Sequence, residues 1–86
     1  MLKLPVMTKL KTLSAQEVVS FLKEQGFLID RQRGSHMVLV RKLISVKQVL
    51  TIPNHSEIDK GTLKAIYNQV KKFIPEEEVR KYFYTD

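Results

Sequence analysis

The fold is decided by the middle of the chain, residues 27–52, which read FLIDRQRGSHMVLVRKLISVKQVLTI. Apolar side chains there either alternate with polar ones or form short β-branched runs, and both patterns are typical of β-strands. The spacing predicts three antiparallel strands. The first begins at Phe27, the second covers Met37–Val40 and the third covers Val46–Ile52. Residues 33–35 include a glycine and predict a tight turn between the first two strands.

The alternation also predicts which side chains share a face of the sheet. In the first strand, one side is expected to carry Phe27, Ile29 and Arg31, and the other Leu28, Asp30 and Gln32. The third strand is expected to place Val46, Leu50 and Ile52 on one face and to stop at Pro53. The face of the sheet turned away from the core is expected to be polar.

One helix is predicted before the strands in the sequence and another after them. Ser14 followed by Glu17 fits a capping box, and apolar residues recur at three- and four-residue spacing until Gly26. This predicts an amphipathic helix over residues 14–25. After the strands, Asp59 can cap a second helix, whose apolar stripe consists of Leu63, Ile66, Tyr67, Val70 and Ile74.

The order of elements predicts an α+β fold, a two-layer αβββα sandwich with both main helices on one face of the sheet. Pro75 ends the second helix and can serve as the first residue of a short C-terminal helix. We expect a single domain over residues 1–86, with a basic extended arm at 1–13, a core at 14–74 and a helical tail at 75–86. The same order of elements occurs in double-stranded-RNA-binding domains.

The composition favours a polyanionic partner. The 86 residues include 15 Lys and Arg against 9 Asp and Glu, a net charge of +6, although solubility alone can also account for a basic balance. The chain has no cysteine, which excludes disulfides, a thiolate nucleophile and a cysteine-type zinc site. No apolar run is long enough to cross a membrane. We therefore expect a cytoplasmic protein without a membrane partner or a cofactor.

The positive charge is concentrated in the strands. Five basic residues could share a surface able to neutralise phosphates: Arg31, Arg33, Arg41, Lys42 and Lys47. The alternative is that they only form the solvated side of a sheet.

Two histidines, His36 and His55, are the side chains that titrate near neutrality. His36 follows Gly34 and Ser35, where turn amides and cationic side chains could meet a phosphate while the imidazole moves a proton. The alternative is a strand-edge histidine bonded to a turn carbonyl. For His55 the favoured interpretation is a capping or loop-ordering role. The two are 19 positions apart and do not have the spacing of metal ligands.

Together, the motifs KLP at residues 3–5, EVVSFLKEQGF, RQRGSHMVL, TIPNHSEIDKGTL and AIYNQV make the sequence similar to the HicA family of mRNA interferase toxins, also described as YcfA-like proteins. The resemblance covers residues 3–83. It implies a double-stranded-RNA-binding-like fold, a ribonuclease that cuts mRNA, and a HicB-type antitoxin as partner. It also implies that His36 is catalytic and that Arg33, Gly34 and Ser35 belong to the same motif. Further matches are His55 and the helix start formed by Gly61, Thr62 and Leu63.

The mechanism that follows uses His36 as general base on a ribose 2′-hydroxyl, with no metal, while Arg31, Arg33 or a lysine offsets charge on the phosphorane. Without its antitoxin the chain is expected to be a monomer. Two other classes stay open: an RNA-binding module without catalysis, and an adaptor whose basic face meets an acidic protein.

Overall fold

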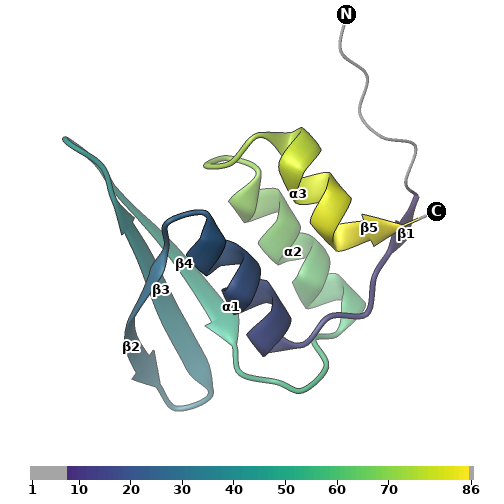
Figure 1. The fold of residues 1–86 in the computed structure, drawn as a ribbon. Coiled ribbons are helices and arrows are strands. Elements are labelled where there is room, and N and C mark those ends of the chain that lie inside the picture. Colours follow the sequence, from purple (N-terminus) through teal and green to yellow (C-terminus); the bar gives the residue numbers. More distant parts are fainter. Residues whose placement is uncertain (1–7, 86) are drawn as a thin grey trace, which may run out of the picture.

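The computed structural model describes residues 8–85 as an α+β fold (Figure 1). Its elements are β1 (Lys9–Leu10), α1 (Ala15–Glu24), β2 (Leu28–Arg33), β3 (His36–Lys42), β4 (Lys47–Pro53), α2 (Lys60–Val70), α3 (Glu76–Phe83) and β5 (Tyr84–Thr85). The predicted order of helix, three antiparallel strands, helix and short helix is confirmed. No helix within residues 8–85 has the length and apolar character needed to span a bilayer.

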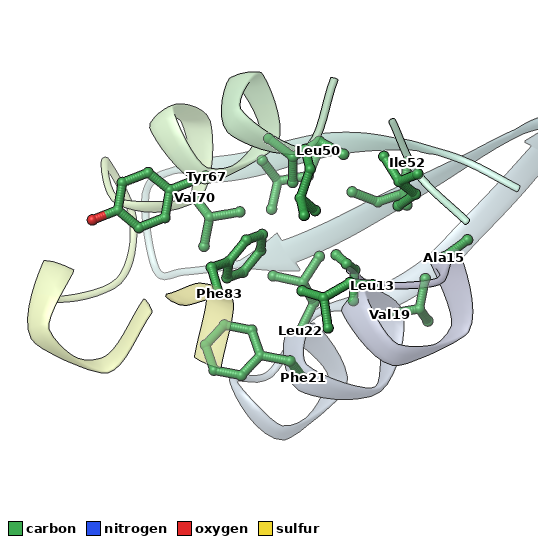
Figure 2. Packing of buried hydrophobic residues seen from close by; sticks show 14 of the residues in the cluster. Leu13, Ala15, Val19, Phe21, Leu22, Leu50, Ile52, Tyr67, Val70 and Phe83 are labelled. Atoms are coloured by element: carbon green, nitrogen blue, oxygen red, sulfur yellow. The ribbon is translucent and has the colours of Figure 1, made fainter. Parts of the chain in front are cut away.

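The main sheet has the strand order β2-β3-β4 with antiparallel pairing throughout. The core fills the space between one face of this sheet and the helices (Figure 2). Leu39, Leu50 and Ile52 supply the sheet side of the core, and Leu22, Val70 and Phe83 are among the helical residues packed with them. Val46 lies before β4 and is exposed, so its predicted place beside Leu50 and Ile52 is wrong.

A β-bulge interrupts β2 and corrects the predicted alternation. Ile29 pairs with Leu39, but the next pair joins Arg31 to Val38, so Asp30 is the extra residue. Because a shift of one residue moves every later side chain to the opposite face, Arg31 lies on the other face from Ile29. The prediction that Arg31 shares a side with Phe27 and Ile29 is therefore wrong.

The first helix ends where its sequence signals predict. The Ser14 hydroxyl accepts from the amide of Glu17 at 3.1 Å, and the Glu17 carboxylate accepts from the amide of Ser14 at 3.0 Å, which completes the capping box. Gly26 follows the helix with φ of 96°, a left-handed conformation that favours glycine. These local interactions fix the direction in which the chain enters and leaves α1.

The second helix is shorter than its apolar stripe suggests. It ends at Val70, and Ile74 is buried beyond the helix, in the connection to α3. Pro75 is the N-cap of α3 rather than its first residue. The stripe was a correct prediction of burial but not of helix length.

Both predicted terminal segments pack against the rest of the chain where they are described. β1 pairs with β5, and Leu13 is buried in the core. α3 contributes Val79 and Phe83, both fully buried. The first seven residues of the predicted arm, and residue 86 of the tail, lie outside the described residues.

Candidate nucleic-acid interface

The strand register places the candidate residues on the sheet face opposite the helices, which we call the open face. It is defined by the residues that pair across the strands on that side: Leu28, Arg31, Arg33, His36, Val38, Val40, Lys42, Lys47, Val49, Thr51 and Pro53. The buried valines of this face, Val38 and Val40, do not belong to the hydrophobic core cluster.

The β2–β3 turn presents His36 at one end of the open face. Arg33 and His36 are directly paired, with Gly34 and Ser35 as the two residues between them. Gly34 has φ of 58°, as the first position of a type II′ hairpin turn requires. His36 is exposed, and its imidazole has no hydrogen-bond partner within residues 8–85. A proton-transfer role is thus sterically and chemically open to it.

Arg31 reaches this surface because of the bulge. Its backbone partner is Val38, and on the open face this pair is the next one along the strands from the Arg33–His36 pair. Its guanidinium donates to the Asp30 carboxylate at 2.8 Å, but both side chains are about half exposed, at 53% and 44%. An exposed pair of this kind contributes about 0–1 kcal/mol, so a phosphate can compete for the guanidinium.

Lys42 and Lys47 form a directly opposed pair at the other end of the open face. Lys42 lies six positions after His36 in β3, which corresponds to about 20 Å at roughly 3.3 Å per residue. Between these ends, Leu28, Val40 and Val49 are paired across the three strands. We call them the apolar lane. Leu28 and Val49 are 68% and 43% exposed, so the prediction of a polar face is wrong at this lane.

Arg41 does not share the open face. Its guanidinium donates to the carbonyl of Gln25 at 2.9 Å, to the carbonyl of Phe73 at 2.8 Å and to the Gln48 side chain at 2.8 Å. It also lies over the Phe27 ring, 5.0 Å from the centroid. Arg41 therefore ties the C-terminal end of α1 and the α2–α3 connection to the sheet, and the prediction that it joins the other basic residues on one surface is wrong.

His55 lies in the loop before α2. Its carbonyl accepts from the amide of Ala15 at 2.9 Å, and its own amide donates to the carbonyl of Pro53 at 2.9 Å. The loop is also tied to the β2–β3 hairpin, because the amide of Asn54 donates to the carbonyl of Ser35. The backbone of this loop thus holds the hairpin in place, while the imidazole of His55 has no hydrogen-bond partner among the described residues.

The second motif of the resemblance, Gly61–Leu63, is the start of α2. The Asp59 carboxylate accepts from the Thr62 hydroxyl at 2.7 Å and from the Thr62 amide at 3.0 Å. These hydrogen bonds lower the pKa of Asp59 below its usual value. Leu63 is fully buried. The geometry of this motif is that of a capped helix start.

The rest of the molecule offers few other sites. Within residues 8–85, no three His, Cys, Asp or Glu side chains come together as a metal-binding group. The two raised tyrosine pKa values, at Tyr67 and Tyr82, result first from burial. Tyr67 donates to the Glu76 carboxylate at 2.7 Å, and Tyr82 donates to the carbonyl of Glu17 at 2.6 Å. Both hydroxyls serve the packing of α3.

Comparison with known proteins identifies the family. The family model described as the HicA toxin of bacterial toxin-antitoxin systems matches residues 15–71, which run from α1 through α2. The chain belongs to the HicA toxin family. HicA members are toxins of toxin-antitoxin systems of the ribonuclease type, and membership implies a HicB-type antitoxin as partner. No curated protein and no solved structure matches the chain closely enough to count as a relative.

The match to the HicA family spans the whole open face and both histidines, and it leaves α3 and the β1–β5 ribbon outside. Sequence reasoning missed the bulge at Asp30 and the apolar lane. The signal for the lane was present, because Leu28, Val40 and Val49 are aliphatic at positions that the hairpin register brings together.

Proposed function

We propose that this HicA toxin is an endoribonuclease that cuts mRNA without a metal, with His36 as the general base. The observation that carries the proposal is the pairing of an exposed, unpartnered histidine with Arg33 across a glycine turn. The bulge adds Arg31 to the same face. A proton acceptor beside two cations suits a reaction in which a hydroxyl is deprotonated as charge develops on a phosphate.

In this mechanism, the neutral imidazole of His36 takes the proton of a ribose 2′-hydroxyl. The 2′-oxygen then attacks the adjacent phosphorus, and the bond from phosphorus to the 5′-oxygen breaks. Arg33 and Arg31 offset the negative charge on the phosphorane oxygens. The leaving 5′-oxygen takes a proton from water, His36 returns its proton to the solvent, and the products are a 2′,3′-cyclic phosphate and a 5′-hydroxyl. One positioned base contributes about 10²–10⁴ in rate, so alignment and charge supply the rest.

RNA binding is proposed for the same turn. Space is open around Gly34, where an added Cβ would meet no other atom within 4 Å. A phosphate can therefore approach the backbone of Gly34 and Ser35 closely while Arg33 neutralises it. Lys42 and Lys47 lie too far along the sheet to touch the same phosphate, and they contribute attraction for the rest of the strand.

Control of the toxin is proposed to come from the HicB-type antitoxin, with acidic groups placed against the basic residues of the open face. The site is shallow and exposed, so covering it is the simplest way to stop cleavage. The free toxin is proposed to be a cytoplasmic monomer.

The test compares two histidines that differ in position but not in chemistry. His36→Gln should retain the circular dichroism spectrum and RNA binding while cleavage falls at least about 10²-fold. His55→Gln is the matched control and should cleave normally, since only the backbone of His55 is engaged. Full cleavage by folded His36→Gln would refute the catalytic assignment.

The same experiment separates the rival functions. RNA that is bound but never cut by the wild-type chain would favour an RNA-binding module without catalysis. Absence of both binding and cleavage would favour an adaptor for an acidic protein.

A further inference from the structure

The β3–β4 connection ends in an exposed aliphatic cluster, which we call the apolar tip and define as Leu43, Ile44 and Val46. Ile44 is fully exposed, and Leu43 and Val46 are 48% and 56% exposed. The hairpin reaches beyond the helices at the upper left of Figure 1. The amide of Leu43 donates to the carbonyl of Val46 at 2.7 Å, which closes the turn and fixes the cluster. Clustered apolar exposure of this kind marks an interaction site.

Positive charge flanks the apolar tip. Lys42 and Lys47 are the directly opposed pair next to the β3–β4 turn, and like charges in this arrangement repel. Neither lysine takes part in an ion pair within residues 8–85. The tip with its base is thus an aliphatic surface bearing two uncompensated cations, and its complement is an apolar pocket edged by carboxylates.

The apolar lane extends this surface. Val40 and Val49 form the next pair along the hairpin from Lys42 and Lys47, and Leu28 pairs with Val40 from β2. A partner that contacts the apolar tip could therefore contact the apolar lane as well, because only the Lys42–Lys47 pair lies between them.

The chemistry discriminates among possible occupants. Aliphatic side chains offer neither a ring for base stacking nor a donor for phosphate, so RNA gains nothing from the apolar tip. A second copy would bring its own Lys42–Lys47 pair against this one, in a chain of net charge +6. A protein surface with an apolar pocket edged by carboxylates complements both the aliphatic side chains and the cations.

We propose that the apolar tip and its two lysines anchor the HicB-type antitoxin, at a place separate from the RNA-cleaving turn. The inference rests on the proposed function only for the identity of the partner. About 20 Å of β3 separates Lys42 from His36. An antitoxin held at the apolar tip must therefore reach along the open face to cover His36, and the residues that hold it differ from those that cut RNA.

The test uses the full chain and a purified HicB-type antitoxin. Ile44→Ser and Leu43→Ser should weaken antitoxin binding by roughly tenfold or more, chiefly through faster dissociation, while RNA cleavage by the free toxin stays within twofold. Ile29→Ser is the matched control, because Ile29 is 44% exposed but faces α1. Lys42→Glu should slow association instead.

Several results would overturn the inference. One is antitoxin affinity that stays within twofold in both serine variants, and another is a wild-type chain that does not bind the antitoxin. Self-association in sedimentation, or binding to phosphatidylcholine–phosphatidylglycerol vesicles, would do the same if it depended on Ile44 while antitoxin affinity did not. Absence of RNA cleavage by the wild-type chain would refute the proposed function, whereas the antitoxin measurement would still decide the present inference.

Discussion

Arg41 and Arg31 should respond very differently to the same substitution. Replacing either by methionine keeps an unbranched side chain and removes the guanidinium. At Arg41 the substitution removes two hydrogen bonds to backbone carbonyls, one to the Gln48 side chain and the cation–π contact with the Phe27 ring. At Arg31 the loss is one exposed ion pair with Asp30.

The expected magnitude at Arg41 follows from these contacts. Each carbonyl bond is worth about 1 kcal/mol after allowance for the half-buried site, and the stacked cation adds about 0.5–1 kcal/mol. The Gln48 side chain can turn to water, so its bond adds less. Arg41→Met should therefore cost about 2–4 kcal/mol, against about 0–1 kcal/mol for Arg31→Met. A chain of this length has roughly 4–13 kcal/mol in total.

Urea unfolding followed by circular dichroism measures both variants. Arg41→Met should lower the midpoint clearly and lower the Tm by at least about 8 °C, while Arg31→Met stays close to the wild type. RNA binding should show the opposite order, with the larger loss in Arg31→Met. Equal unfolding midpoints for the two variants would refute the assignment of Arg41 to the framework and Arg31 to the open face.

Three further outcomes are expected. Cleavage should proceed at the same rate with excess EDTA as with added Mg²⁺, and activity that returns only with the metal would contradict the general-base mechanism. Ser14→Ala should lower the free energy of unfolding by about 1 kcal/mol in urea titration, because it removes one half of the capping box, and an unchanged midpoint would show that the box does not stabilise α1. Arg33→Ala should weaken RNA binding in filter assays and reduce the slope of log affinity against log salt by roughly 0.7, which an unchanged slope would contradict.

The first helix and its caps could be predicted because their signals are local. The Ser14–Glu17 box and the positive φ of Gly26 depend on residues within a few positions of one another. The pairing of β1 with β5 had no such signal. It joins Lys9 to Thr85, and two-residue strands carry too little pattern to be detected.

The candidate site was predicted in part for the same reason. The Gly34–Ser35 turn places Arg33 opposite His36 by local geometry alone. The faces of Arg31 and Arg41 could not be derived, since they depend on the bulge at Asp30 and on carbonyls far away in sequence. Two arginines of identical chemistry therefore lie on opposite faces of the sheet.

The ends of the cleaved RNA test the central claim most directly. The reaction should be run with the wild-type chain on an RNA that is cut at one position, and on the same RNA with a 2′-deoxyribose there. His36 as base on the 2′-hydroxyl predicts a 2′,3′-cyclic phosphate and a 5′-hydroxyl from the first substrate and no cleavage of the second. A 5′-phosphate product, or cleavage of the deoxy substrate at the same position, would contradict it.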